Sequence, residues 1–241
     1  MLSLLRWIST FFHGSNTSEE ISEEQPQGVV DNTRLKSIQG VVTSLCNYYG
    51  WINDSILFNM EVISDNVPLK IGTNVLALVE QDEITHTLKA IKVKVMNDLP
   101  EGSEPSKLGR RLCIRCVTSV TEEDVYVTEN MSFPLYLFSG AFKPFKGDLV
   151  LVEYSMNSGT SNINIHSVSP LNSQDMNEVY VTSIDGRNGM VEARVFFTLD
   201  SLQIPSGYTP GLYDIVDVVA VDSIQQHCSL RAVSMTPVQE E

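Results

Sequence analysis

The stretch Val42-Thr43-Ser44 decides the fold, because the same tripeptide returns as Val117-Thr118-Ser119 and again as Val181-Thr182-Ser183. In every copy a phenylalanine follows the threonine 15 residues later and a glycine follows it 29 residues later. The phenylalanines are Phe58, Phe133 and Phe197, and the glycines are Gly72, Gly147 and Gly211. Agreement at fixed spacing indicates one module that occurs three times.

Each copy has the pattern of an all-β unit. It holds four or five short segments rich in β-branched residues, separated by Gly, Asn, Asp and Pro turns, and it shows no long helical period. A unit of about 60 residues buries its apolar side chains most economically by closing its sheet into a five-stranded barrel. We therefore predict three tandem barrels at residues 37–97, 110–171 and 177–238, with the three phenylalanines in their cores.

Composition narrows the range of partners. The chain has 241 residues, of which 42% are apolar and 19% charged, and its formal net charge is −14. Such a charge repels phosphate, so we expect no binding to duplex DNA, and only a local patch could hold a nucleic acid. The four cysteines are few for a disulfide framework and indicate a reducing compartment, with the cytoplasm expected first and the nucleus as an alternative.

Residues 1–13, MLSLLRWISTFFH, predict a short amphipathic helix. Arg6 interrupts the apolar run and no small-residue cleavage site follows, so we do not expect a secretory signal. Three roles stay open for the helix, namely folding back on the chain, docking in a partner's groove, or lying on a membrane, which its single basic residue disfavours. Residues 14–36 are polar and predict a disordered tether. The apolar stripe that would bind a partner comprises Leu4, Trp7, Ile8, Phe11 and Phe12.

The first copy resembles the cold-shock domain family in the segments Asn47–Ile52 and Ser55–Asn59. The resemblance implies two nucleic-acid-facing strands whose outward aromatic side chains stack on unpaired bases. Tyr49 and Trp51 are the candidate stacking residues, and Phe196 is their counterpart in the third copy. The alternative is that these rings pack against the barrel surface or a neighbouring module. The candidate phosphate contacts are Lys70, Lys89 and Lys92.

A wider resemblance covers nearly the whole chain. The Met-Leu-Ser-Leu start, Phe11-Phe12, the block Gly186-Arg187-Asn188-Gly189 and the run from Val195 to Leu202 resemble the cancer/testis antigen 55 family. The same region is similar to the amino-terminal part of the Armitage-type germline RNA helicase of the piRNA pathway. This implies a testis-enriched protein connected with male germ-cell development. It does not imply helicase activity, because the sequence lacks the Gly-x-x-x-x-Gly-Lys-Ser/Thr phosphate loop.

No motif for catalysis or metal binding is evident. Cys113 and Cys116 have zinc-like spacing but lack a second pair, and the four histidines are scattered. We therefore expect no cofactor, no metal and no enzymatic activity. The sequence favours a non-catalytic protein-interaction module or adaptor in male germ cells, with protein partners that it does not identify. The alternative is weak single-stranded RNA binding on the first barrel.

Overall fold

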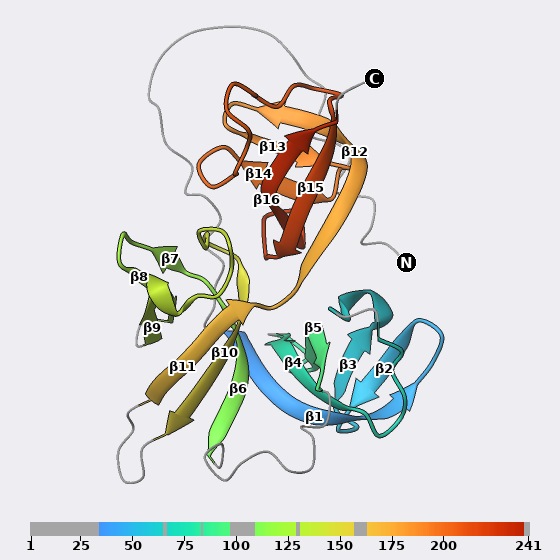
Figure 1. The fold of residues 1–241 in the computed structure, drawn as a ribbon. Coiled ribbons are helices and arrows are strands. Elements are labelled where there is room, and N and C mark those ends of the chain that lie inside the picture. The colour runs from blue at the N-terminus through green and yellow to red at the C-terminus, as the bar shows by residue number, and fades with distance from the viewer. Residues whose placement is uncertain are drawn as a thin grey trace, which may run out of the picture.

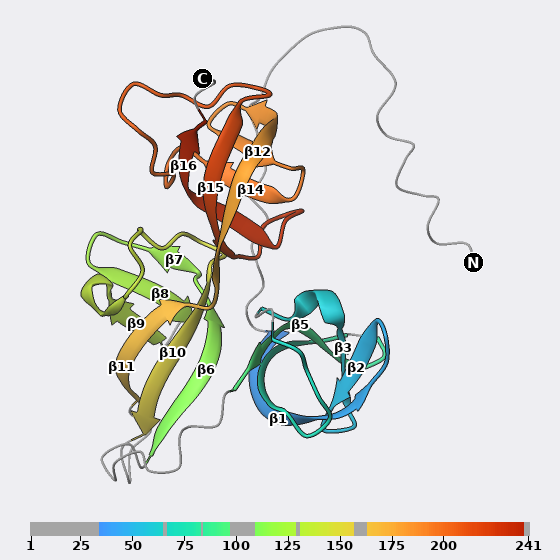
Figure 2. The ribbon, with the colours of Figure 1, turned by 45° about the vertical axis from the view of Figure 1, so that its right-hand side comes forward.

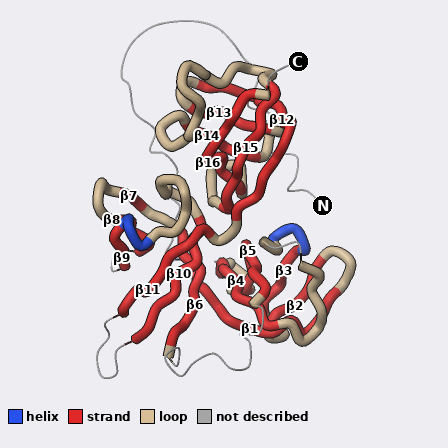
Figure 3. The backbone as a smooth tube through the Cα atoms, in the orientation of Figure 1, coloured by secondary structure: helices blue, strands red, loops and turns tan. Residues whose placement is uncertain are grey.

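A computed structural model describes residues 34–64, 67–82, 84–96, 109–128, 131–156 and 163–238. The predicted amino-terminal helix at residues 1–13 and all but the end of the predicted tether lie outside these residues. The described chain is all-β, as predicted, and its only named helical elements are two short 3-10 turns, η2 (Met60–Val62) and η4 (Leu135–Leu137). Figure 3 shows strands and loops almost throughout.

The first copy forms a closed five-stranded barrel, as predicted. Its strand order is β1-β2-β3-β5-β4, and Figure 2 looks into the ring that these strands make. Closure depends on a short parallel pairing of β3 with β5, because every other pair of neighbours in this barrel is antiparallel. The strands are β1 (Leu35–Leu45), β2 (Tyr49–Ile52), β3 (Ile56–Asn59), β4 (Asn74–Gln81) and β5 (Leu88–Val95).

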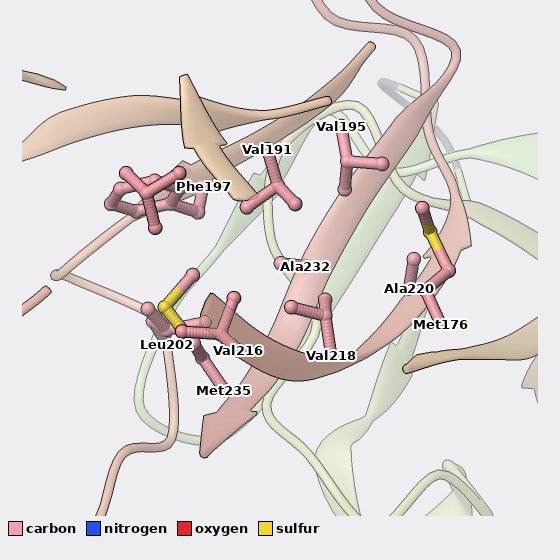
Figure 4. Close-up of a cluster of buried hydrophobic side chains, with 11 residues drawn as sticks. Met176, Val191, Val195, Phe197, Leu202, Val216, Val218, Ala220, Ala232 and Met235 are labelled. Atoms are coloured by element: carbon pink, nitrogen blue, oxygen red, sulfur yellow. The ribbon is translucent and has the colours of Figure 1, made fainter. Parts of the chain in front are cut away.

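The third copy repeats this closed topology in the order β12-β13-β14-β16-β15, with a parallel pairing of β14 with β16. Its core lies inside the ring, where Figure 4 shows Phe197 with valines and methionines from the surrounding strands. The strands are β12 (Ser173–Asp185), β13 (Asn188–Val191), β14 (Val195–Thr198), β15 (Ile215–Asp222) and β16 (Leu230–Pro237).

The middle copy does not form the closed barrel that the sequence predicts. Its strands make two three-stranded sheets, β11-β10-β6 and β7-β8-β9 (Figure 1). The two sheets still share one apolar core. The long first strand of the other copies is here divided into β6 and β7. No strand pairing joins β9 to β11 in the described residues, although the equivalent strands pair in both barrels. The strands are β6 (Arg110–Cys116), β7 (Ser119–Val120), β8 (Asp124–Thr128), β9 (Met131–Pro134), β10 (Leu149–Met156) and β11 (Ile163–Pro170).

The repeated phenylalanines are core residues, and this prediction is confirmed. Each is at most 1% exposed. In the two closed barrels the ring lies over a glycine of the neighbouring strand, Gly50 under Phe58 and Gly189 under Phe197. The middle copy has Val125 at that place, opposite Phe133. The ring therefore fills the interior at one fixed point of the sheet, which explains the constant spacing.

The repeated glycine has the same structural place in two copies and a different one in the third. Gly72 and Gly147 have φ of +92° and +96°, and each donates its N–H to the carbonyl of the repeated valine. In the third copy Tyr213 makes this bond with φ of +69°, two residues after Gly211. The third copy has a longer connection before this turn, so a count of residues from the threonine misplaces it.

The first barrel packs against the middle unit through a second apolar cluster on the outer faces of their sheets. Leu76 and Leu78 point outward from β4 and meet Ile114 and Leu149 of the middle unit. The Ser37 hydroxyl accepts the Ile114 N–H at 2.9 Å. Because the inward residues of β4 fill the barrel core, this strand is buried on both faces.

The third barrel is joined to the other two units by buried ion pairs. Arg231 on β16 makes two hydrogen bonds to the Asp148 carboxylate of the middle unit, at 2.8 and 2.7 Å. Lys92 on β5 donates to Asp222 on β15 at 2.5 Å, and the Ser64 hydroxyl donates to the same carboxylate at 2.9 Å. The three units therefore contact one another directly as well as through their linkers.

Candidate nucleic-acid interface

Strands β2 and β3 present four side chains on the outside of the first barrel. Gly50 and Ile52 face inward, so the alternation of the strand turns Tyr49 and Trp51 outward. The register pairs Trp51 with Leu57 and Tyr49 with Asn59 on β3. We call this surface the Tyr49–Trp51 face and define it as Tyr49, Trp51, Leu57 and Asn59.

The Tyr49–Trp51 face is open rather than packed against another unit. Tyr49 is 47% exposed and Trp51 is half-buried, and neither belongs to the apolar clusters within or between the units. A hydrogen bond with the Cys46 side chain is the main cause that raises the pKa of Tyr49, which favours the neutral phenol. Two rings on adjacent outward positions suit base stacking, since every base offers a π-face.

The three candidate lysines lie in different places. Lys89 is exposed and pairs with Leu57 in the parallel register of β3 and β5, so it flanks the Tyr49–Trp51 face. Lys70 is exposed in the turn before β4. Lys92 does not fit the predicted role, because it is 9% exposed and its ammonium is bound to Asp222. Binding of phosphate by Lys92 would first require its buried ion pair with Asp222 to separate, and the free-energy cost of that separation opposes this role.

The third barrel lacks a comparable face. The residues at the equivalent positions are Asn188, Met190, Phe196 and Thr198, of which Thr198 is buried. Phe196 is half-buried and has no aromatic neighbour among these residues. Arg231, which pairs with Phe196 in the register of β14 and β16, is bound to Asp148. The structure therefore does not bring Phe196 together with Tyr49 and Trp51 on one strand pair.

The middle unit is also a poor match. Tyr126 faces outward opposite Ser132, while Asp124 stands opposite Pro134. The turn before them carries the exposed pair Glu122 and Glu123, whose charge opposes phosphate. Of the three equivalent surfaces, the one on the first barrel alone carries two outward aromatic rings on one strand.

The cysteines give no metal site in the described part of the chain, where no group of three or more His, Cys, Asp or Glu side chains could hold an ion. Cys113 belongs to the core of the middle unit and Cys116 to the cluster between units, so they face opposite sides of β6. Burial raises the pKa of the Cys113 thiol. No described helix is both long and apolar enough to cross a membrane.

The sequence alone did not identify two arrangements of polar side chains. One is the two buried ion pairs between units, and the other is a cleft between the first two units that is lined by Lys36 and Arg115. The uninterrupted apolar run Val75–Val79 could have indicated the contact between units. A strand buried on one face alternates apolar and polar residues, whereas a strand buried on both faces is apolar throughout. Nothing in the local pattern around Arg115 indicates the cleft.

Comparisons with known proteins agree with this fold. Residues 17–77 match the family model of the N-terminal OB domain of Mov10l1-like RNA helicases, and residues 88–171 match that of the cancer/testis antigen 55 N-terminal domain. The human RNA helicase Mov10l1 is 38% identical over 245 residues, which is 99% of this chain. The mouse RNA helicase Mov10l1 is 38% identical over 196 residues, 79% of this chain.

The chain spans only 20% of the human helicase and 16% of the mouse one. A solved structure of drosophila Unr CSD456 covers 86% of this chain and 98% of its own, at 15% identity and a TM-score of 0.24, which is too low to establish a shared overall fold. The family models confirm the resemblance to the cancer/testis antigen 55 family and to the amino-terminal part of the germline helicase: the chain matches the Mov10l1-like N-terminal OB domain in its first part and the cancer/testis antigen 55 N-terminal domain after it.

Proposed function

We propose that the chain is a non-catalytic binding protein of male germ cells that holds single-stranded RNA weakly on the Tyr49–Trp51 face. The observation that carries the proposal is the placement of both rings on adjacent outward positions of a closed barrel, outside the contacts between units. The similarity to a region of an RNA helicase and to its OB domain supports RNA as the ligand. We place this activity in the cytoplasm.

The energetics favour modest affinity. Each stacked base contributes about 1–3 kcal/mol, so two rings offer roughly 2–6 kcal/mol before the cost of ordering the strand. Lys89 is the one candidate lysine that flanks the face, while the whole chain carries a net charge of −14. Each phosphate contact contributes about −0.7 to the slope of log K against log salt for a single strand, so we expect a shallow slope.

Tryptophan fluorescence tests the proposal directly. In a Trp7→Phe background Trp51 is the only tryptophan, and titration with oligo-U at low salt should quench it saturably. Tyr49→Ala should weaken binding by roughly tenfold, which corresponds to about 1.4 kcal/mol of lost stacking. The matched control is Tyr136→Ala, which removes a tyrosine that is 83% exposed on the middle unit.

Two results would contradict RNA binding at this face. One is an absence of quenching by oligo-U at millimolar concentration. The other is equal binding by the Tyr49→Ala and Tyr136→Ala variants, which would show that any RNA contact lies elsewhere.

A protein adaptor is the second candidate function, and a surface of the third barrel favours it. Leu212 and Tyr213 are 49% and 72% exposed, and Tyr180, at 49%, precedes the repeated valine to which Tyr213 bonds. Asp214 holds their loop by accepting hydrogen bonds from the Tyr208 hydroxyl and the Gly211 N–H at 2.8 and 2.7 Å. Exposed aromatic residues on a fixed loop suit a protein contact.

The adaptor role is tested by affinity purification from testis lysate with wild type and a Tyr180→Ser/Leu212→Ser variant. A specific protein retained by wild type and lost by the variant supports it. Identical recovery, with unchanged oligo-U binding, would assign function to the first barrel alone.

A further inference from the structure

A cleft of about 410 Å³ lies where the first barrel meets the middle unit. Its walls come from β1, β4, β6 and β8, and its polar lining residues are Lys36, Ser37, Arg115 and Thr128. None of its described lining residues is acidic, although the chain carries 30 acidic residues against 16 basic ones. The cleft is thus a local cationic site on an acidic protein.

Arg115 occupies a position that the other two units fill with a small or apolar residue. Arg115 lies on β6, two residues after Cys113 and two residues before Val117, which directly follows the strand. Cys113 and Val117 both belong to the core of the middle unit, so the alternation of the strand turns Arg115 to the same side. Two residues before the repeated valine, the first barrel has Gly40 and the third has Val179. An arginine at a core-facing position is not required by this fold.

The guanidinium of Arg115 is incompletely satisfied. Its Nε is buried and has no hydrogen-bond partner, while Nη1 reaches only the carbonyl of Ile114 at 3.3 Å. No carboxylate of the described residues pairs with it. Arg231, by contrast, binds Asp148 twice and also donates to a serine hydroxyl at 2.9 Å. Since an unmatched buried donor is destabilising, a retained one points to an acceptor that is not part of the fold.

The neighbours of Arg115 complete a set of donors. Lys36 is exposed at the same cleft and brings a second positive charge. The Ser37 oxygen accepts the Ile114 N–H, which leaves the hydroxyl proton available for donation. A guanidinium with an ammonium and hydroxyls, and with no competing carboxylate, matches the charge and acceptor oxygens of a phosphate group.

We propose that this cleft binds a phosphate group of a single-stranded nucleic acid, through Arg115 and Lys36. The inference rests on the proposed RNA-binding function and extends it to a second contact. Strand β1 links the two places, because Lys36 at its start lines the cleft while Ser44 near its end pairs with Trp51. The phosphate can be an internal phosphodiester or a terminal phosphomonoester, which share this chemistry.

The experiment measures fluorescence anisotropy of a labelled oligo-U of about 12 nucleotides, within the usual span of an OB fold. It compares wild type with Arg115→Gln, Lys36→Gln and the control Arg111→Gln, which removes an exposed arginine of the same strand outside the cleft. Arg115→Gln should weaken binding roughly tenfold, and either cleft variant should lower the magnitude of the salt slope by about 0.7. Arg111→Gln should stay within about twofold of wild type.

A stability measurement separates binding from a structural role. Arg115→Gln should not lower the melting temperature, because the substitution removes a half-buried charge without a carboxylate partner and a buried Nε without an acceptor. If Arg115→Gln unfolds the chain, the Lys36→Gln variant tests the proposal instead, because Lys36 is exposed. An oligo-U with a 5′-phosphate that binds the wild type more tightly than the unphosphorylated one, but not the cleft variants, assigns the terminal group.

The outcomes that overturn the inference differ from those that overturn the proposed function. Unchanged affinity and salt slope in both cleft variants, with Trp51 still quenched by oligo-U, would exclude the cleft as a binding site and leave the proposed binding at the Tyr49–Trp51 face unaffected. No binding of oligo-U to wild type would remove both. Displacement of oligo-U by a phosphopeptide that binds equally tightly would overturn nucleic acid as the ligand.

Discussion

The ion pair between Arg231 and Asp148 is a buried contact between the third barrel and the middle unit, and Asp148→Ala is the change that tests its contribution. The two nitrogen–oxygen distances are 2.8 and 2.7 Å, and the side chains are 0% and 3% exposed. The guanidinium carbon also lies 5.8 Å and 5.4 Å from the ring centroids of Phe142 and Phe145. Loss of the carboxylate would leave a guanidinium buried among these rings.

Removal of one partner of such a pair costs about 3–5 kcal/mol, because the remaining charge stays desolvated. In a body of this size 1 kcal/mol corresponds to about 2–4 °C, so we expect the melting temperature to fall by roughly 10 °C. Replacement of both partners by apolar residues, Asp148→Leu with Arg231→Met, should recover part of that loss, since neither charge is then buried while the Phe145 N–H still loses the Asp148 oxygen that accepts it at 2.9 Å.

Urea and thermal unfolding followed by circular dichroism measure these differences. The control is Asp200→Ala, which breaks an ion pair with Arg187 whose side chains are 64% and 59% exposed. That change should cost less than about 1 kcal/mol, as exposed pairs do. If Asp148→Ala cost no more than Asp200→Ala, the buried pair would not hold the units together and the reasoning would be wrong.

Three further predictions concern single sites. Tyr213→Gly should raise the free energy of unfolding by roughly 1 kcal/mol in urea, because φ of +69° strains a non-glycine residue; a decrease would contradict this. Gly189→Ala should destabilise by about 1–3 kcal/mol in the same assay, since its Cβ would lie 2.3 Å from the Phe197 ring; no loss would show that the ring can move. Hydrogen bonds from Thr85 lower the pKa of Asp82, so its stabilising effect should be complete above the unfolded pKa and lost as pH falls through the lowered one; urea unfolding at a series of acidic pH values in which Asp82→Asn shows the same pH dependence of stability as wild type would refute this.

The elements that the sequence predicted well are those set by local periodicity. Phe58, Phe133 and Phe197 are buried because one ring fills each core at the same point of the sheet. The same two-residue alternation placed Tyr49 and Trp51 together on one outward face. Both features depend only on residues of neighbouring strands, whose order the repeat reveals.

The misjudged features depend on contacts that local periodicity does not encode. Closure of the middle copy requires pairing between β9 and β11, and a shared apolar pattern cannot show whether those edges meet. Lys92 is bound to Asp222 of another unit, and the sequence around Lys92 does not reveal this partner. The cleft combines Lys36 with Arg115, which only the packing of two units brings together.

The link between Lys92 and Asp222 also orders events during translation. The carboxylate lies 130 residues after the ammonium, so the first barrel leaves the ribosome long before its partner strand is made. Until the middle unit is made, the nascent barrel presents Leu76 and Leu78 to solvent, a surface prone to aggregation or chaperone binding, and Lys92 lacks its carboxylate partner until Asp222 follows. A chain that ended before Asp222 would leave Lys92 without this carboxylate.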